Sequence, residues 1–396
     1  MSVAAEETAR HSAAASQSES GFAGVLLQPF ARVTSGGRFV PCIDGLRCIA
    51  ILAVVLYHLN GYVLEKADGF SEAEVRESLI FHLLHGASCG VQIFFAISGF
   101  ILALPFAREH IDGGRRVSLR QYYFRRVTRL EPPFLINLLL IWALLIVVKN
   151  ESAADLWAPL AATATYTHNF VYGTLSTINA VTWSLEIEVQ FYIVAPFLAR
   201  WYFGSNQNHR RSLIVVAIVA LMVSKMLIIP ENKLRLGLLY PLNHFLVGIF
   251  IADLFVNSWQ ERIAAKRGWD IVAAITLPCI FLSQLNPITY HLLPLLSAFL
   301  FIAALRGKWT NRLLSVPLIA VIGGMCYSIY LYHFLVISMV GRFTISATDG
   351  YGYLTQMMLQ SLFIVPPVVV VCAVFFVTIE KPFMKWRPGR KAVEAA

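Results

Sequence analysis

The sequence predicts an all-α polytopic membrane protein with about ten transmembrane helices around a central polar cavity. Hydrophobic residues make up 57% of the 396 residues and charged residues only 14%. The mean hydropathy of +0.65 lies outside the range of soluble globular domains. The formal charge of +9 comes from basic residues scattered between apolar stretches. Membrane topology therefore explains the charge, and no nucleic-acid partner is expected.

Ten apolar stretches resemble membrane spans in length and composition. The expected spans are residues 43–64, 86–107, 133–149, 180–203, 212–229, 236–256, 269–287, 289–305, 319–340 and 354–379. The fourth is the weakest by hydropathy because Glu186, Glu188 and Gln190 interrupt it, and residues 157–172 compete with it as a re-entrant or interfacial segment. The sequence shows no evident internal repeat, which argues against an inverted-repeat transporter.

The two ends of the chain differ from this apolar region. Residues 1–40 are rich in Ala, Ser, Glu and Gly, so we expect a flexible cytoplasmic segment there rather than a secretory signal. Residues 41–382 form the expected transmembrane domain, and residues 383–396 form a basic cytoplasmic tail. Each predicted inner segment holds three or more Lys or Arg, and each outer loop holds at most two. The positive-inside rule therefore predicts a multi-pass protein of the cell membrane with both termini in the cytoplasm.

The first span carries ionisable residues that a lipid-facing helix would not tolerate. Arg47 and His58 are eleven residues apart, which is about three helical turns and roughly 16 Å of rise, so both side chains leave one face of the helix. Asp44 lies on that face too. Histidine suits proton transfer near neutral pH, and we therefore interpret this face as one wall of a site, with His58 as a candidate general base. The alternative is a histidine that only packs between helices.

Three arginines precede the third span, in a predicted inner segment that holds seven arginines between residues 108 and 129. They are Arg125, Arg126 and Arg129. On a helix Arg125 and Arg129 share a face, and Pro132 and Pro133 mark the expected start of the next span. Guanidinium groups bind phosphates in a bidentate manner, which favours a cytosolic nucleotide-like ligand such as coenzyme A. Ordinary positive-inside anchoring is the competing interpretation.

The fourth span contributes a second polar group. Its candidates are Trp183, Ser184, Glu188 and Tyr192. Glu188 and Tyr192 are one turn apart on one side of the helix, whereas Glu186 falls on another face. A carboxylate at this depth needs a partner, which Arg47 or His58 would supply, although a purely structural ion pair would also satisfy it.

Later and earlier spans add further candidates. A string near the start of the ninth span contains Ser328, Tyr330 and His333, and the second span contains Ser98 beside Gly99. The Ser-Gly pair favours close helix packing over catalysis. The six cysteines form no Cys-x-x-Cys pair, and the histidines lack metal-ligand spacing, so we expect neither a metal site nor a disulfide framework.

These motifs follow one another in a fixed order. Asp44-Gly45-Leu46-Arg47 is followed by ten residues and His58, and then come the strings GVQIFFAISGFIL, RRVTRLEPPF, TWSLEIEVQFY and YSIYLYH and the closing Glu380-Lys381-Pro382. Together, over residues 41–382, they resemble the membrane O-acyltransferases called acyltransferase family 3. The resemblance implies ten transmembrane helices and transfer of an acyl group, commonly acetyl from cytosolic acetyl-CoA, to a hydroxyl of a carbohydrate or another acceptor.

The resemblance also implies roles for residues. Arg47 and His58 match the family's Arg-x10-His pair, with His58 essential, and Glu188 matches the carboxylate of its WSLxxE pattern. Its cytoplasmic arginine motif corresponds to Arg125, Arg126 and Arg129. Gln92 stands where the family usually has an acid, which argues against a proton-transfer role there. The family's frequent esterase-like C-terminal extension is missing from the sequence, so we expect the reaction to be completed within the membrane or with a partner.

Both lines of reasoning lead to one predicted mechanism. Acyl-CoA is a co-substrate, with no permanently bound cofactor, and its phosphates lie on the three arginines while its acyl end reaches His58. His58 acts as general base, and Asp44, Arg47 and Glu188 position groups and balance buried charge. An acyl-enzyme on Ser98, Ser184 or His58 is the variant of this mechanism.

Two other classes of function compete with this enzyme. A proton-coupled transporter would use His58 and Glu188 as a relay, and an inactive scaffold would use none of these groups. Exported polysaccharide, a lipid-linked sugar and a small natural product all stay open as acceptors, and the oligomeric state is unknown.

Overall fold

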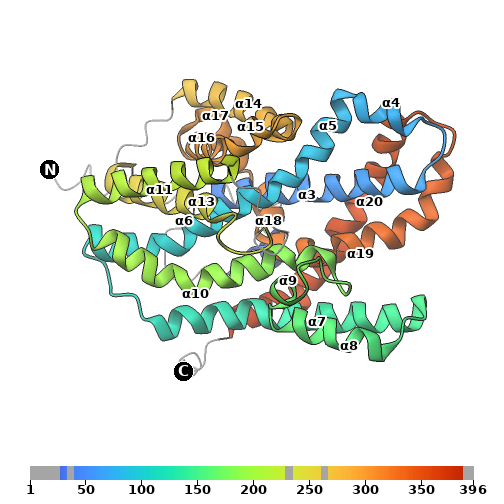
Figure 1. The fold of residues 1–396 in the computed structure, drawn as a ribbon, viewed down its shortest axis with the longest axis horizontal. Helices are drawn as coiled ribbons and strands as arrows, with labels where there is room; N and C mark the ends of the chain where they lie inside the picture. The colour runs from blue at the N-terminus through green and yellow to red at the C-terminus, as the bar shows by residue number, and fades with distance from the viewer. Residues whose placement is uncertain (1–26, 34–39, 228–234, 260–265, 387–396) are drawn as a thin grey trace, which may run out of the picture.

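The computed structural model describes residues 27–33, 40–227, 235–259 and 266–386. Within these ranges the chain forms helices and connecting loops and no strand, as an all-α protein requires. Figure 1 shows the long helices running side by side, with α3 near the centre, α7 and α8 along one edge and α14 to α17 gathered on the opposite edge. Most of the predicted segment 1–40, namely residues 1–26 and 34–39, and residues 387–396 of the predicted tail lie outside the described residues.

The helices follow the order of the expected spans. The long ones are α3 (Pro41–Lys66), α6 (Gly90–Ile111), α7 (Leu119–Lys149), α10 (Trp183–Phe203), α11 (Gln207–Leu227), α13 (Leu242–Leu254), α14 (Arg267–Leu282), α16 (Leu293–Arg306), α19 (Cys326–Thr344) and α20 (Tyr353–Phe375). Shorter α-helices are α4 (Glu72–Glu77), α5 (Leu79–Gly86), α8 (Ala153–Ala164), α9 (His168–Tyr172), α15 (Pro287–His291), α17 (Lys308–Leu314), α18 (Pro317–Gly324) and α21 (Lys381–Lys385). The remaining turns are η1 (Gln28–Phe30), η2 (Ala87–Cys89), η3 (Ala180–Thr182), η4 (Phe255–Trp259), η5 (Ser283–Leu285), η6 (Ile345–Thr348) and η7 (Phe376–Glu380), of which η4 and η7 are π-helical.

Six helical segments of the described chain are long and apolar enough to cross a membrane. They are Pro41–Lys66, Leu79–Ile111, Leu119–Lys149, Arg267–Leu285, Cys326–Thr348 and Tyr353–Lys385. A seventh is possible if α16 and α17, which are bent by 86° at their junction, form one span. The chain is thus a multi-pass membrane protein by length and composition. Each of the ten expected ranges overlaps one long helix, but crossing by all ten stays a prediction.

The start of α7 differs from the sequence-based expectation. The predicted span begins at residue 133, whereas the helix begins at Leu119 and continues through Pro132 and Pro133. The side chain of Ser118 caps its first turn by accepting a hydrogen bond from the backbone of Gln121 at 3.4 Å. An N-cap of this kind satisfies one of the free amides at a helix start. The arginine segment therefore lies on the same helix as the apolar span, which fixes the direction of its side chains.

Close packing of α6 against α13 forms the centre of the bundle. A Cβ atom on Gly99 would lie 2.1 Å from the backbone oxygen of Phe245, and one on Gly248 would lie 2.1 Å from that of Ala96. Only glycine permits two backbones to approach so closely, as small residues do between membrane helices. The expectation that Gly99 serves close helix packing is confirmed.

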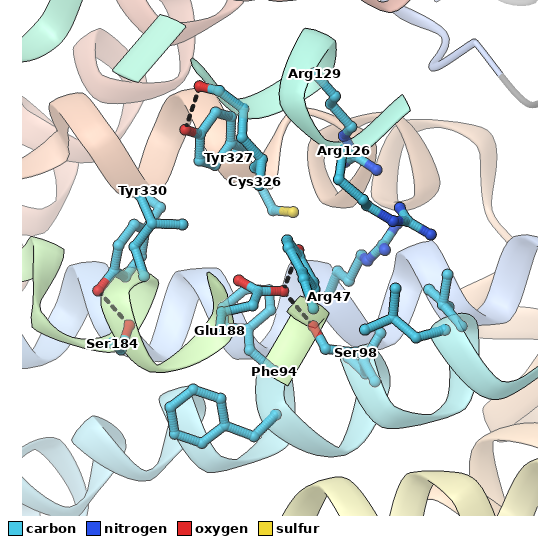
Figure 2. A pocket seen from close by; sticks show the side chains of 17 residues that line it. Arg47, Phe94, Ser98, Arg126, Arg129, Ser184, Glu188, Cys326, Tyr327 and Tyr330 are labelled. Carbon is cyan, nitrogen blue, oxygen red and sulfur yellow. Dashed lines mark hydrogen bonds between the residues drawn. The ribbon is translucent and has the colours of Figure 1, made fainter. Parts of the chain in front are cut away.

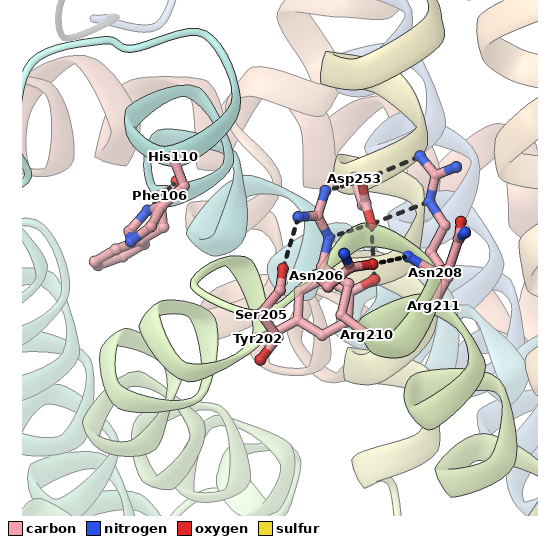
Figure 3. A network of polar contacts seen from close by, with 9 residues as sticks. All are labelled: Phe106, His110, Tyr202, Ser205, Asn206, Asn208, Arg210, Arg211 and Asp253. Atoms are coloured by element: carbon pink, nitrogen blue, oxygen red, sulfur yellow. Dashed lines mark hydrogen bonds and ion pairs between the residues drawn. The ribbon is translucent and has the colours of Figure 1, made fainter.

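A buried ion-pair network joins α10, α11 and α13 at one end of the bundle (Figure 3). Asp253 of α13 has no exposed surface. Its carboxylate accepts hydrogen bonds from the Tyr202 hydroxyl at 2.9 Å and from Arg210 at 2.9 and 3.0 Å. Arg211 adds two longer ones, at 3.2 and 3.3 Å. A buried carboxylate with this many donors is fully compensated, so the three helices are fixed relative to one another.

The described part of the N-terminal segment packs against the first long helix. Residues Gln28–Phe30 form η1, and Arg32 lies 3.4 Å from the carboxylate of Asp44. Lys381, at the start of α21, donates to the backbone oxygens of Gln28 and Pro29. Residues 27–33 therefore reach the polar end of α3.

Candidate active site

A cavity with a volume of about 80 Å³ lies between five long helices. Figure 2 shows the side chains of the 17 residues that line it. Its polar lining consists of Arg47 from α3, Ser98 from α6, Arg126 and Arg129 from α7, Ser184, Glu188 and Tyr192 from α10, and Cys326, Tyr327 and Tyr330 from α19. Phenylalanine, leucine and isoleucine side chains, mostly of α6, complete the wall. Eight of the thirteen residues predicted from the sequence thus meet at one cavity.

Arg47 is held at the cavity wall by Asp44. The Arg47 side chain is only 9% exposed, and its Nη1 atom donates to the Oδ1 atom of Asp44 at 2.6 Å. Asp44 is itself buried and also meets Arg32. Because one guanidinium nitrogen is engaged on the Asp44 side, the rest of the group faces the cavity. Asp44 therefore positions Arg47 and does not line the cavity.

Glu188 links α10 to α6 inside the cavity. Its Oε1 atom accepts hydrogen bonds from the Tyr192 hydroxyl at 2.7 Å and from the Ser98 hydroxyl. Figure 2 shows Glu188 and Ser98 together beside Arg47. Both bonds use the same carboxylate oxygen, so a negative charge is held in a fixed place opposite the arginines.

Two of the three predicted arginines enter the cavity. Arg126 lies over the rings of Tyr122 and Tyr192 at 5.4 and 5.6 Å, and Arg129 follows one turn later on the same side. The Nε atoms of both are buried and, within the described ranges of the chain, have no hydrogen-bond partner. Arg125 is exposed, donates to the backbone oxygen of Gln121 at 3.1 Å and does not line the cavity. The two arginines on the cavity face of α7 are therefore Arg126 and Arg129. Helical spacing in the sequence instead predicts a face shared by Arg125 and Arg129.

Tyr330 and Ser184 close one side of the cavity. Their hydroxyl groups are 2.7 Å apart, and Tyr330 also donates to the backbone oxygen of Val181. Trp183, the neighbour of Ser184, does not line the cavity; its backbone oxygen accepts from the side chain of Asn169 at 2.8 Å. Trp183 therefore contributes through its backbone to the packing of α9 on α10.

His58 and His333 lie beside the cavity and do not line it. Their ring centroids are 5.1 Å apart, and the ring of Tyr330 is 6.1 Å from that of His333. Arg47 and His58 both face α19, because Arg47 lines the cavity with Cys326 and His58 contacts His333. The two side chains therefore leave α3 on one side, as their spacing predicts, and Tyr330 both lines the cavity and approaches His333.

Sequence reasoning missed several of the residues at this site. Cys326 lies directly before the string YSIYLYH and lines the cavity, and Tyr327, the first residue of that string, lines it as well although it was not singled out. Glu380 was named only as part of the closing motif, with no role; it is fully buried and accepts from the Ser328 hydroxyl at 2.8 Å. Arg32 carries no periodic signal in a Ser- and Gly-rich stretch. No group of three or more His, Cys, Asp or Glu within the described ranges is placed to hold a metal ion.

Known proteins of related sequence match most of the chain. A family model described as an acyltransferase domain matches residues 40–379. A relative from Staphylococcus aureus strain COL, named "Putative O-acetyltransferase", is 24% identical over 89% of this chain and 59% of its own. The O-acetyltransferase OatA of S. aureus strain NCTC 8325 is 23% identical over 82% of this chain and 55% of its own. The chain thus spans little more than half the length of the curated relatives it matches, and no solved structure matches it.

Proposed function

The chain belongs to the acyltransferase domain family, and on that premise we propose that it is an acyl-CoA-dependent membrane O-acyltransferase. The acyl group is most simply acetyl, in line with the names of the relatives. The acceptor is a hydroxyl of a carbohydrate or a glycosylated molecule. The observation that carries the proposal is the single cavity at which arginines, a carboxylate and hydroxyl groups from five helices meet.

The donor is proposed to bind with its phosphates at Arg126 and Arg129. Both side chains face the cavity with buried, unpartnered Nε atoms, and guanidinium groups are well suited to phosphate. This places the basic end of the cavity in the cytoplasm, which agrees with the positive-inside expectation for the arginine-rich segment. The cell membrane and cytoplasmic termini are parts of the same proposal.

The acyl end is proposed to lie at the Tyr330 side, the side nearest to His333 and His58. The acceptor oxygen attacks the thioester carbonyl carbon while His58 takes the hydroxyl proton. The carbon–sulfur bond then breaks, and the departing CoA thiolate takes the proton from the His58 imidazolium to leave as free thiol. Arg47 and the Glu188 carboxylate carry opposite charges at fixed positions and so orient the donor. Because these charges are already in place, little solvent has to reorganise during the reaction.

Acylation assays in membranes test this proposal. Membranes that carry the full chain are supplied with acetyl-CoA labelled in the acetyl group, and free thiol and label in the carbohydrate fraction are measured. We expect both products in equal amounts, and neither from the His58→Ala variant at wild-type protein level. A transporter would instead move substrate across sealed vesicles with no thiol release, which would contradict the proposal.

A further inference from the structure

Two histidines from different helices face each other beside the cavity. His58 of α3 and His333 of α19 have ring centroids 5.1 Å apart, with ring planes at 49°. His333 has no exposed surface, and His58 is partly buried. Aromatic rings complete the surroundings of His58, with Tyr57 at 5.0 Å and Phe334 at 5.4 Å.

Backbone contacts fix the position of the proton on His333. Its Nδ1 atom lies 2.8 Å from the backbone oxygen of Tyr330 and 3.0 Å from that of Ile329. Carbonyl oxygens only accept hydrogen bonds, so Nδ1 must carry the hydrogen. Both carbonyls belong to the preceding turn of α19 itself. The helix therefore selects one tautomer of His333 whatever ligand is present.

The second nitrogen of His333 is then an unused acceptor. In a neutral ring with its hydrogen on Nδ1, the lone pair is on Nε2. The Nε2 atom is buried and has no hydrogen-bond partner among the residues that the structure describes. A buried acceptor without a donor is unfavourable, and such atoms in folded proteins call for a specific reason. The neighbouring imidazole with a donor to offer is that of His58.

We propose that His333 is a positioning residue for His58. During turnover its Nε2 accepts the N–H of His58, which leaves the opposite nitrogen of His58 free to take the acceptor proton. Two imidazole rings joined by an N–H···N bond of about 2.9 Å have centroids roughly 5 Å apart once the ring radii are added. The observed 5.1 Å fits this separation, and the bond forms by rotation of the His58 ring.

This inference rests on the proposed function and adds to it the origin of the His58 tautomer. A general base works efficiently when a third group orients it and stabilises its protonated form. Here the neutral imidazole of His333 orients the base, a role that a carboxylate has in many other active sites. The bond between the two rings stabilises the imidazolium that forms while the thioester is attacked, without placing a second buried charge beside it.

Three substitutions in the full chain test the role of His333. His333→Phe keeps a ring of similar shape and removes the acceptor, and His333→Gln restores an acceptor oxygen. The matched control is His244→Phe, because His244 of α13 is also buried and also has an unpartnered ring nitrogen. The assay is thiol release from acetyl-CoA in membranes, with protein level checked for every variant. We expect about a tenfold or larger loss of kcat in His333→Phe with KM for acetyl-CoA unchanged, most of it recovered in His333→Gln, and wild-type rates in the control.

A double variant separates positioning from a general structural effect. If His333 acts through His58, His58→Ala with His333→Phe is no slower than His58→Ala alone, because residues that act as a unit do not add their losses. Fully additive losses would overturn the inference, as would a wild-type kcat in His333→Phe when His58→Ala is inactive. A fully active His58→Ala variant would contradict the base assignment in the proposed function, and the inference would fail with it.

Discussion

The Nη1 atom of Arg47 lies 2.6 Å from the Oδ1 atom of Asp44, one turn earlier in α3. Both side chains are almost completely buried, so each depends on the other for charge compensation. Asp44 also meets Arg32 from the N-terminal segment at 3.4 Å. The cavity wall at Arg47 is therefore held by an ion pair that a single substitution can break.

Asp44→Asn is expected to destabilise the protein strongly. The substitution leaves the buried guanidinium of Arg47 and the partly buried one of Arg32 without their anion, and removing one partner of a buried ion pair typically costs about 3–5 kcal/mol. Thermal unfolding of the purified protein in detergent measures the effect. The matched control is Glu72→Gln, which breaks the exposed ion pair with Arg76 and is expected to cost about 0–1 kcal/mol. Equal shifts for the two variants would contradict the buried role of Asp44.

Arg126→Ala is expected to weaken donor binding, whereas Arg125→Ala is not. Arg126 lines the cavity, and Arg125 is exposed outside it. Losing a charged hydrogen bond of about 1.5–3 kcal/mol raises KM for acetyl-CoA about tenfold or more. Initial rates at varied acetyl-CoA concentration give KM for acetyl-CoA in the two variants. If the two variants have the same KM, these arginines act in topology rather than in donor binding.

Cys326 offers a direct probe of where the donor binds. Its thiol lines the cavity beside Arg47 and Arg129. In a variant that keeps Cys326 as its single cysteine, acetyl-CoA is expected to slow alkylation by N-ethylmaleimide. A variant that keeps only the exposed Cys279 is the control, and its labelling should not respond. Labelling of Cys326 that is indifferent to saturating acetyl-CoA would place the donor elsewhere.

Glu188→Gln is expected to lower kcat about tenfold or more with little change in KM. The substitution removes the negative charge that lies in the cavity with Arg47 and weakens the bonds from Ser98 and Tyr192. Tyr192→Phe removes only one of these bonds, so we expect a smaller loss. Steady-state kinetics on both variants tests whether Glu188→Gln loses more kcat than Tyr192→Phe. A Glu188→Gln enzyme with wild-type kcat would leave Glu188 a structural residue.

Asp253→Asn is expected to affect folding and not chemistry. Asp253 compensates two arginines away from the cavity and joins three helices. We expect a lower Tm and less protein in the membrane, but unchanged kcat per folded molecule and unchanged KM for acetyl-CoA. A changed KM in the folded fraction would show that this network reaches the donor site.

Much of the helical framework follows from the sequence, because runs of apolar residues of span length mark helices directly. Pro132 and Pro133 misled the prediction for α7, because prolines usually end or kink a helix, whereas here they lie in the interior of a helix that starts at the Ser118 cap and continues to Lys149. The fixed order of motifs also sufficed to predict the family, which the family match confirms.

The candidate site is less predictable than the framework. Spacing along one helix gives shared faces, as for Arg47 and His58, but it does not say which helices meet. The pairing of Ser184 with Tyr330, the placement of Arg126 rather than Arg125 in the cavity and the approach of His333 to His58 all depend on packing between distant segments. Cys326 and Arg32 had no signal, because neither residue type at those positions is unusual.

Tyr330 belongs both to the cavity wall and to the surroundings of His333. Within the described residues its hydroxyl is held by Ser184 and by the backbone of Val181 alone, and each such bond contributes only about 0.5–1.5 kcal/mol. In the proposed mechanism, rotation of this one phenol ring would connect the cavity with the imidazole pair, while the surrounding helices keep their places. Side-chain rotations of this kind are faster than helix rearrangements, so the proposed acyl transfer would not require the bilayer to accommodate a moving bundle.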